Sequence, residues 1–88
     1  MQHKDEVKVT KSPTKWDLMI SFAERKTVTI GTTMGELPIQ ITKIEQEDGS
    51  CESWCIKGYI DHKGRNCSNV KGYFRTDQNT GILEITRP

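Results

Sequence analysis

The chain of 88 residues is short enough for a single domain, and since only 33% of its residues are hydrophobic, its core is small. Thirteen lysines and arginines against twelve aspartates and glutamates leave a net charge of +1. That balance excludes a protein that coats nucleic acid or membranes through a large excess of positive charge. No apolar run reaches the roughly 18 residues of a membrane span, and the polar N-terminus carries no signal-peptide pattern.

The N-terminal segment predicts an arm in front of the folded domain. Residues 1–14 are mostly polar. We therefore expect a flexible N-terminal arm, in which Val7 and Val9 fit a short edge strand. The single β domain is expected to span 15–88.

Alternation of apolar and polar residues predicts β-strands in the rest of the chain. The alternation runs through 16–22, stops at a polar break over 24–26 and resumes at 28–30. This pattern predicts an antiparallel hairpin whose apolar residues share one face. Further strands are expected over 37–41, 52–61, 69–76 and 82–86, with turn signals between them.

The spacing of these strands is typical of an all-β fold, and no stretch shows convincing helical periodicity. Five or six strands in one small domain predict an antiparallel meander or barrel of SH3-like or OB-like size. The order of the strands and the closure of a barrel stay open at this point.

A near-repeat lies in the second half of the chain. Ile-Lys-Gly-Tyr-Ile at 56–60 recurs as Val-Lys-Gly-Tyr-Phe at 70–74. A hairpin whose turn is centred near Arg65 pairs Ile56 with Phe74 and places both of them in the core together with Trp54. It also sets the two glycines opposite each other, which leaves room for a bulky side chain, Trp16 or Phe22, to approach the sheet.

The other face of this hairpin is the most suggestive surface of the sequence. Two tyrosines interleaved with cations can stack on bases and bind phosphates. Cross-strand Tyr–Lys pairs, Lys57 with Tyr73 and Tyr59 with Lys71, would equally suit an ordinary solvent-exposed sheet. The candidate binding residues are Lys57, Tyr59, Lys71, Tyr73 and Arg75, with Lys63 and Arg65 in the adjoining turn.

Cys51, Cys55, His62 and Cys67 have the residue types of a zinc site. On an extended strand, however, Cys55 and His62 lie about 23 Å apart and point to opposite faces, so no metal site is predicted. Three cysteines fit a reducing compartment better than a disulfide scaffold. No motif supplies a nucleophile with an oriented base, so we predict neither catalytic residues nor a cofactor.

These observations favour a non-catalytic small β-barrel module of the inhibitor or adaptor type that recognises another protein. An exposed strand edge, or the acidic turn at 45–52 and the basic turn at 62–66, would make the contact. The alternatives are single-stranded nucleic-acid binding through the Tyr59 and Tyr73 face, and a small apolar ligand in the barrel mouth. We expect a cytoplasmic location, no membrane partner, and an uncapped edge strand as a route to homo-oligomers.

Overall fold

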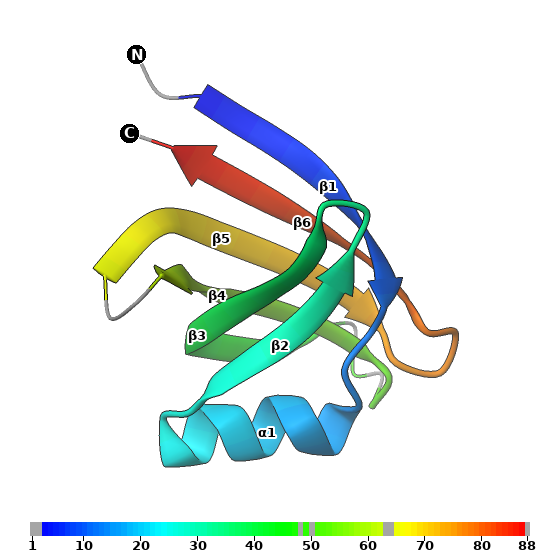
Figure 1. Cartoon of the computed structure of the whole chain (residues 1–88). Helices are drawn as coiled ribbons and strands as arrows, with labels where there is room; N and C mark the ends of the chain where they lie inside the picture. Colours follow the sequence, from blue (N-terminus) through cyan, green and yellow to red (C-terminus); the bar gives the residue numbers. More distant parts are fainter. Residues whose placement is uncertain (1–2, 48, 50, 63–64, 88) are drawn as a thin grey trace.

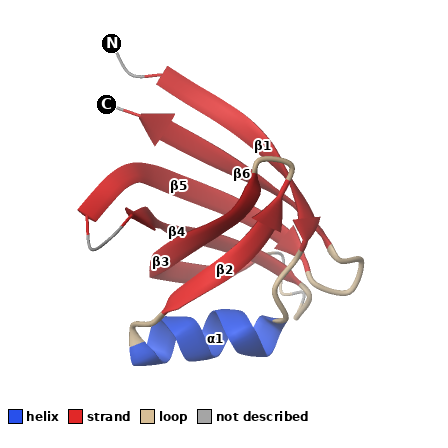
Figure 2. Ribbon diagram, viewed as in Figure 1, coloured by secondary structure: helices blue, strands red, loops and turns tan. Residues whose placement is uncertain are grey.

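The computed structural model describes residues 3–47, 49, 51–62 and 65–87, which form a closed six-stranded antiparallel barrel with one helix (Figures 1 and 2). Consecutive strands are neighbours, and the first strand pairs with the last to close the barrel. The prediction of a small all-β meander or barrel is confirmed. The elements are β1 (His3–Lys11), α1 (Lys15–Glu24), β2 (Thr27–Thr32), β3 (Gly35–Gln46), β4 (Ser53–His62), β5 (Arg65–Arg75) and β6 (Thr80–Arg87).

The N-terminal segment is part of the barrel, so the arm expected over 1–14 is wrong for residues 3–11. β1 pairs with β6 from His3 to Val9, and with β2 at Val9 and Lys11. Val7 and Val9 are buried in the core. A strand with one solvent-exposed face needs an apolar side chain only at alternate positions, and two valines are sufficient here.

α1 occupies the segment for which the sequence predicts the first strand of a hairpin. The backbone N–H of Asp17 donates to Oγ1 of Thr14 over 3.0 Å, and the backbone N–H of Thr14 donates to Oδ2 of Asp17 over 3.2 Å. The helix ends at Arg25, which has a left-handed φ of 56°. Because this capping box satisfies free N–H groups of the first turn, the segment folds as a helix despite its alternating pattern. β2 pairs with β3 instead of with residues 16–22.

The barrel interior is filled mainly by β-branched and aromatic side chains. Leu18 of α1 is fully buried and joins them, so the helix packs its inner side against the barrel core. The prediction that Trp54, Ile56 and Phe74 share the core is confirmed. The buried cluster consists of Val7, Val9, Leu18, Val28, Ile30, Ile39, Ile41, Trp54, Ile56, Val70, Phe74, Leu83 and Ile85.

The hairpin of β4 and β5 keeps the predicted faces but has a different register. Trp54 lies opposite Phe74, and Ile56 lies opposite Gly72. This is a shift of two residues from the predicted pairing of Ile56 with Phe74. Side chains alternate with period two, so a shift of two residues leaves every side chain on its predicted face. The register of the pairing shifts between Ile60 and Asp61, close to the turn, and the sequence pattern gives no sign of this shift.

The glycines of the near-repeat are not opposite each other, and each is required by the barrel itself. A Cβ at Gly58 would lie 2.0 Å from the carbonyl oxygen of Gln40, and a Cβ at Gly72 would lie 2.9 Å from core side chains. The expectation that Trp16 or Phe22 fills the space above them is therefore wrong. Both of those side chains are exposed on α1.

Candidate functional site

The predicted Tyr/Lys face does not form one continuous platform. Lys57 lies directly opposite Lys71, and the two tyrosines lie on either side of this lysine pair. Tyr59 and Tyr73 are four residues apart in the ladder, which is about 13 Å along the strands. The predicted pairs of Lys57 with Tyr73 and of Tyr59 with Lys71 are wrong because of the register shift described above.

Lys71 and Tyr73 form a closer unit. Nζ of Lys71 lies 5.3 Å from the centre of the Tyr73 ring, and a hydrogen bond with Tyr73 raises the pKa of Lys71. Arg75 is engaged elsewhere, because its Nε lies 3.3 Å from Oδ1 of Asp77. This contact lowers the pKa of the Asp77 carboxyl. Of the three cations predicted on this face, Arg75 is therefore already neutralised by a neighbour.

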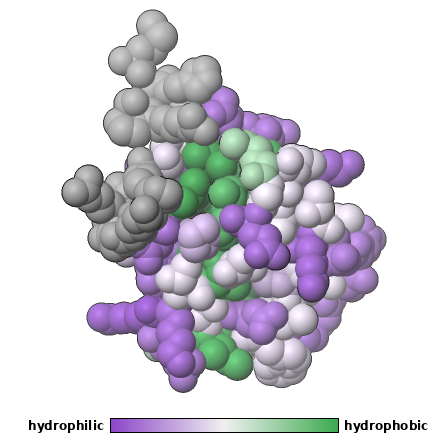
Figure 3. Space-filling model, in the orientation of Figure 1, coloured by the Kyte–Doolittle hydropathy of each residue, from purple (hydrophilic) through white to green (hydrophobic). Residues whose placement is uncertain are grey.

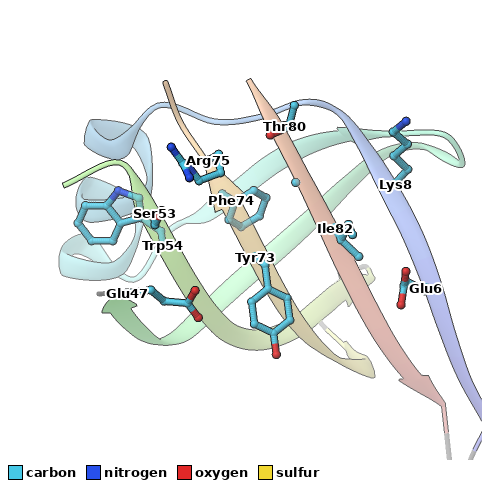
Figure 4. A pocket seen from close by; sticks show the side chains of 11 residues that line it. Glu6, Lys8, Glu47, Ser53, Trp54, Tyr73, Phe74, Arg75, Thr80 and Ile82 are labelled. Atoms are coloured by element: carbon cyan, nitrogen blue, oxygen red, sulfur yellow. The ribbon is translucent and has the colours of Figure 1, made fainter. Parts of the chain in front are cut away.

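A depression of about 500 Å³ opens on the outer face of β5, β6 and β1 (Figure 4). Tyr73 and Ile82 lie opposite each other on neighbouring strands and share its centre. Glu6 and Lys8 of β1 line one side, and Arg75 lies at one end. The depression therefore combines an aromatic and aliphatic floor with a charged rim.

A second depression, of about 330 Å³, adjoins the first along the same strands. Lys4, Lys57 and Lys71 line it, together with the carboxylate of Glu84. Nζ of Lys4 lies 3.3 Å from Oε2 of Glu84, so these two charges offset each other. The surplus positive charge of this depression comes from the opposed pair Lys57 and Lys71.

The largest group of exposed apolar side chains lies on α1, where the sequence predicts a strand. Four of the six large hydrophobic side chains that are exposed in the described part of the chain belong to this helix. Figure 3 shows hydrophobic surface at the lower edge of the molecule, where Figure 1 places α1. The four are Trp16 (62% exposed), Met19 (45%), Ile20 (54%) and Phe22 (39%).

The arrangement of these side chains follows from helical geometry. Trp16, Met19, Ile20 and Ala23 have the spacing of one helix face, and all four are exposed. Leu18 anchors the opposite side in the core. A surface helix normally turns apolar residues inward and polar residues outward. α1 has apolar residues on both sides, and we call the outward set of Trp16, Met19, Ile20 and Ala23 the α1 face.

The start of α1 is fixed to the barrel by an ion pair. Nζ of Lys15 lies 2.8 Å from Oε1 of Glu52, just before β4. The hydroxyl of Thr76 also donates to the Glu52 carboxylate, and the two contacts together lower the pKa of Glu52. Nζ of Lys15 lies 5.8 Å from the centre of the Trp16 ring. The most exposed aromatic ring of the α1 face therefore stands beside a side chain that is itself held in place.

A third depression, of about 610 Å³, lies where the end of α1 meets β3 and β4. Phe22, Ala23 and Arg25 line it from the helix side, and Gln40 and Tyr59 line it from the barrel side. It is therefore continuous with the α1 face. Tyr59, one of the predicted binding residues, belongs to this depression and not to the two that contain Tyr73 and Lys71.

The candidate metal ligands and cysteines do not come together among the described residues. No group of three or more His, Cys, Asp or Glu among them could hold a metal ion. Cys51 and Cys55 are free thiols, and burial raises the pKa of the Cys55 thiol. Four residues considered in the sequence analysis lie outside the described structure: Lys63 lies outside it entirely, and only the side chains of His62, Arg65 and Cys67 lie outside it.

Comparison of the chain with protein-family models, with curated proteins and with solved structures finds no match. Within the described ranges, no helix has the length and apolar character needed to cross a membrane.

Proposed function

We propose that this protein is a non-catalytic binding module that recognises another protein through the α1 face. One observation carries the proposal: the helix is anchored by Leu18 on its inner side and is apolar on its outer side. The three large side chains of the α1 face, Trp16, Met19 and Ile20, together expose on the order of 300 Å² of surface. That area is within the roughly 300–600 Å² of the largest apolar patch on a typical monomer, which is often functional.

Trp16 is suited to be the anchor of the contact. Tryptophan is enriched among the few interface residues that supply most of the binding energy. The ammonium group of Lys15 lies beside the Trp16 ring and is itself paired with Glu52.

The charges around the α1 face favour a foreign partner over a second copy of the chain. Asp17 and Glu24 are seven residues apart, so they lie along the same flank of the helix, and both are exposed. Nζ of Lys26 lies 3.4 Å from Oε2 of Glu24, so Asp17 carries most of the negative charge of this acidic flank. Two copies pairing antiparallel across a two-fold axis would bring this acidic flank against itself, which costs binding energy. The complementary partner has an apolar cleft with lysine or arginine along one border, and α1 lies in it as a helix in a groove.

The contact extends past the helix. The α1 face is smaller than the roughly 800 Å² that each partner buries in a standard interface. The third depression, beside Phe22 and Tyr59, adjoins the α1 face and offers space for one inserted side chain of the partner. A contact of this kind needs no catalytic group, as expected for an inhibitor or an adaptor.

Affinity capture with three baits tests the proposal. The baits are the wild-type chain, Ile20→Glu and Met34→Glu. Ile20 and Met34 are 54% and 57% exposed, so both substitutions should leave the fold intact, which urea unfolding checks. Met34 lies in the turn between β2 and β3, away from α1 (Figure 1), and is the matched control.

We expect the wild type and Met34→Glu to retain the same partner and Ile20→Glu to lose it. With the purified partner, Glu24→Lys should weaken binding because it reverses one charge of the acidic flank. Equal capture by all three baits would contradict the proposal. So would a result in which light scattering finds only self-association of the chain, sensitive to Ile20→Glu.

A further inference from the structure

We infer that the outer face of β5, β6 and β1 carries a second binding site, which accepts a nucleotide unit. The base lies against Tyr73 and Ile82 in the depression shown in Figure 4, and the phosphate lies between Lys57 and Lys71 in the depression beside it. None of these side chains belongs to the α1 face. The inference is therefore independent of the proposed protein partner.

The two depressions are adjacent because alternate residues of the same strands line them. Lys71 and Tyr73 are two residues apart on β5, and Glu84 and Ile82 are two residues apart on β6. Such neighbours on one face of a strand are separated by about 7 Å. A nucleotide spans a comparable distance between its base and its 5′-phosphate.

The half of the site around Tyr73 has the properties of a base pocket. Its volume of about 500 Å³ lies within the usual range for small-molecule sites, roughly 300–1,000 Å³. Ile82 is 41% exposed and lies opposite Tyr73, so an aromatic ring and an aliphatic side chain share the floor. The carboxylate of Glu6 at the rim can accept a hydrogen bond from an exocyclic amino group of a base.

The other half of the site has the properties of an anion subsite. Lys57 and Lys71 lie directly opposite each other, and like charges in this position destabilise a sheet; on its other side, Lys71 lies opposite Glu84, which offsets part of this repulsion. An anion between the two ammonium groups would remove this repulsion. Because Glu84 is paired with Lys4, its carboxylate repels the anion less than an unpaired one would.

Free mononucleotides and single-stranded nucleic acids present the same unit. Two probes distinguish these sources: a fluorescein-labelled single-stranded DNA of six nucleotides, followed by anisotropy, and adenosine 5′-monophosphate, followed by NMR. With two lysines in contact with phosphate, the log–log salt slope for the oligonucleotide should be about −1.4. A much tighter complex with the oligonucleotide would identify nucleic acid as the ligand, and equal affinities would identify the free nucleotide.

Two pairs of variants test the site itself. Tyr73→Ala and Lys71→Met should each weaken oligonucleotide binding about tenfold or more. The matched controls are Tyr59→Ala and Lys43→Met. Tyr59 lines neither depression, and Lys43 lies in the same cross-strand row but is paired with Glu45. Both controls should keep the wild-type affinity within about twofold.

Three results would overturn the inference. The first is no binding of either probe at millimolar concentration. The second is an equal loss of affinity in the controls and in the site variants, all of them folded by circular dichroism. The third is inorganic phosphate binding as tightly as the mononucleotide, because the base would then contribute nothing.

Discussion

Replacement of Leu18 by alanine tests the inner side of α1, on which the proposed orientation of the helix depends. Leu18 has no exposed surface, whereas Ile20, two residues away, is 54% exposed. Truncation of a buried leucine leaves a cavity and costs about 2–5 kcal/mol. Ile20→Ala removes a side chain that is mostly in water already, so we expect a cost below about 1 kcal/mol. In a strand over 16–22, the two residues would share one face and their substitutions would cost similar amounts.

Urea unfolding monitored by circular dichroism measures both changes. A loss of about 3 kcal/mol is a large part of the 5–15 kcal/mol or so by which domains are usually stable, and it would lower the melting temperature by roughly 12–24 °C. If Leu18→Ala does not fold, Leu18→Met should still fold and cost less than about 1.5 kcal/mol, because it conserves volume. Equal losses for Leu18→Ala and Ile20→Ala would refute the helix and the α1 face with it.

Two further substitutions test the barrel and its ion pairs. Gly58→Ala should lower the free energy of unfolding by about 3 kcal/mol or more, because its Cβ would lie 2.0 Å from the carbonyl oxygen of Gln40; an unchanged thermal midpoint would show that β4 is packed differently. Lys15 and Thr76 lower the pKa of the Glu52 carboxyl from 4.5. These contacts therefore stabilise the folded state at neutral pH, and this stabilisation is lost as the pH falls below about 4.5 through the lowered pKa. Glu52→Gln should therefore show a smaller loss of stability between pH 5 and about pH 3 than the wild type, and identical pH profiles would contradict the pairing.

The strands of the second half of the chain could be predicted because the alternation of apolar and polar residues along a strand does not depend on which residues of the two strands pair. Trp54, Ile56 and Phe74 reach the core in the predicted and in the observed pairing alike, since the two differ by an even number of residues. The pairing itself depends on a shift of register near the turn, and nothing in the residue types indicates it. The consequence for the candidate site is direct: Tyr59 and Tyr73, predicted on one platform, line different depressions.

The helix was harder to predict because its apolar residues break the usual pattern of a surface helix. Trp16, Ile20 and Phe22 lie at even positions, as they would on one face of a strand, and they remain exposed in the helix. The signal that identifies α1 is local: Thr14 and Asp17 have the spacing of a capping box. Sequence rules tend to fail at functional sites, and the α1 face is one of the places where they fail in this chain.

Photocrosslinking from the helix tests the central claim most directly. A benzophenone side chain replaces Ile20 in one sample and Met34 in the other. Both proteins are irradiated in the presence of the proteins retained in the affinity capture. The account predicts adducts with one partner protein from position 20 and none from position 34, mapped to an apolar cleft bordered by lysine or arginine. Adducts only with a second copy of this chain, or equal adducts from both positions, would contradict it.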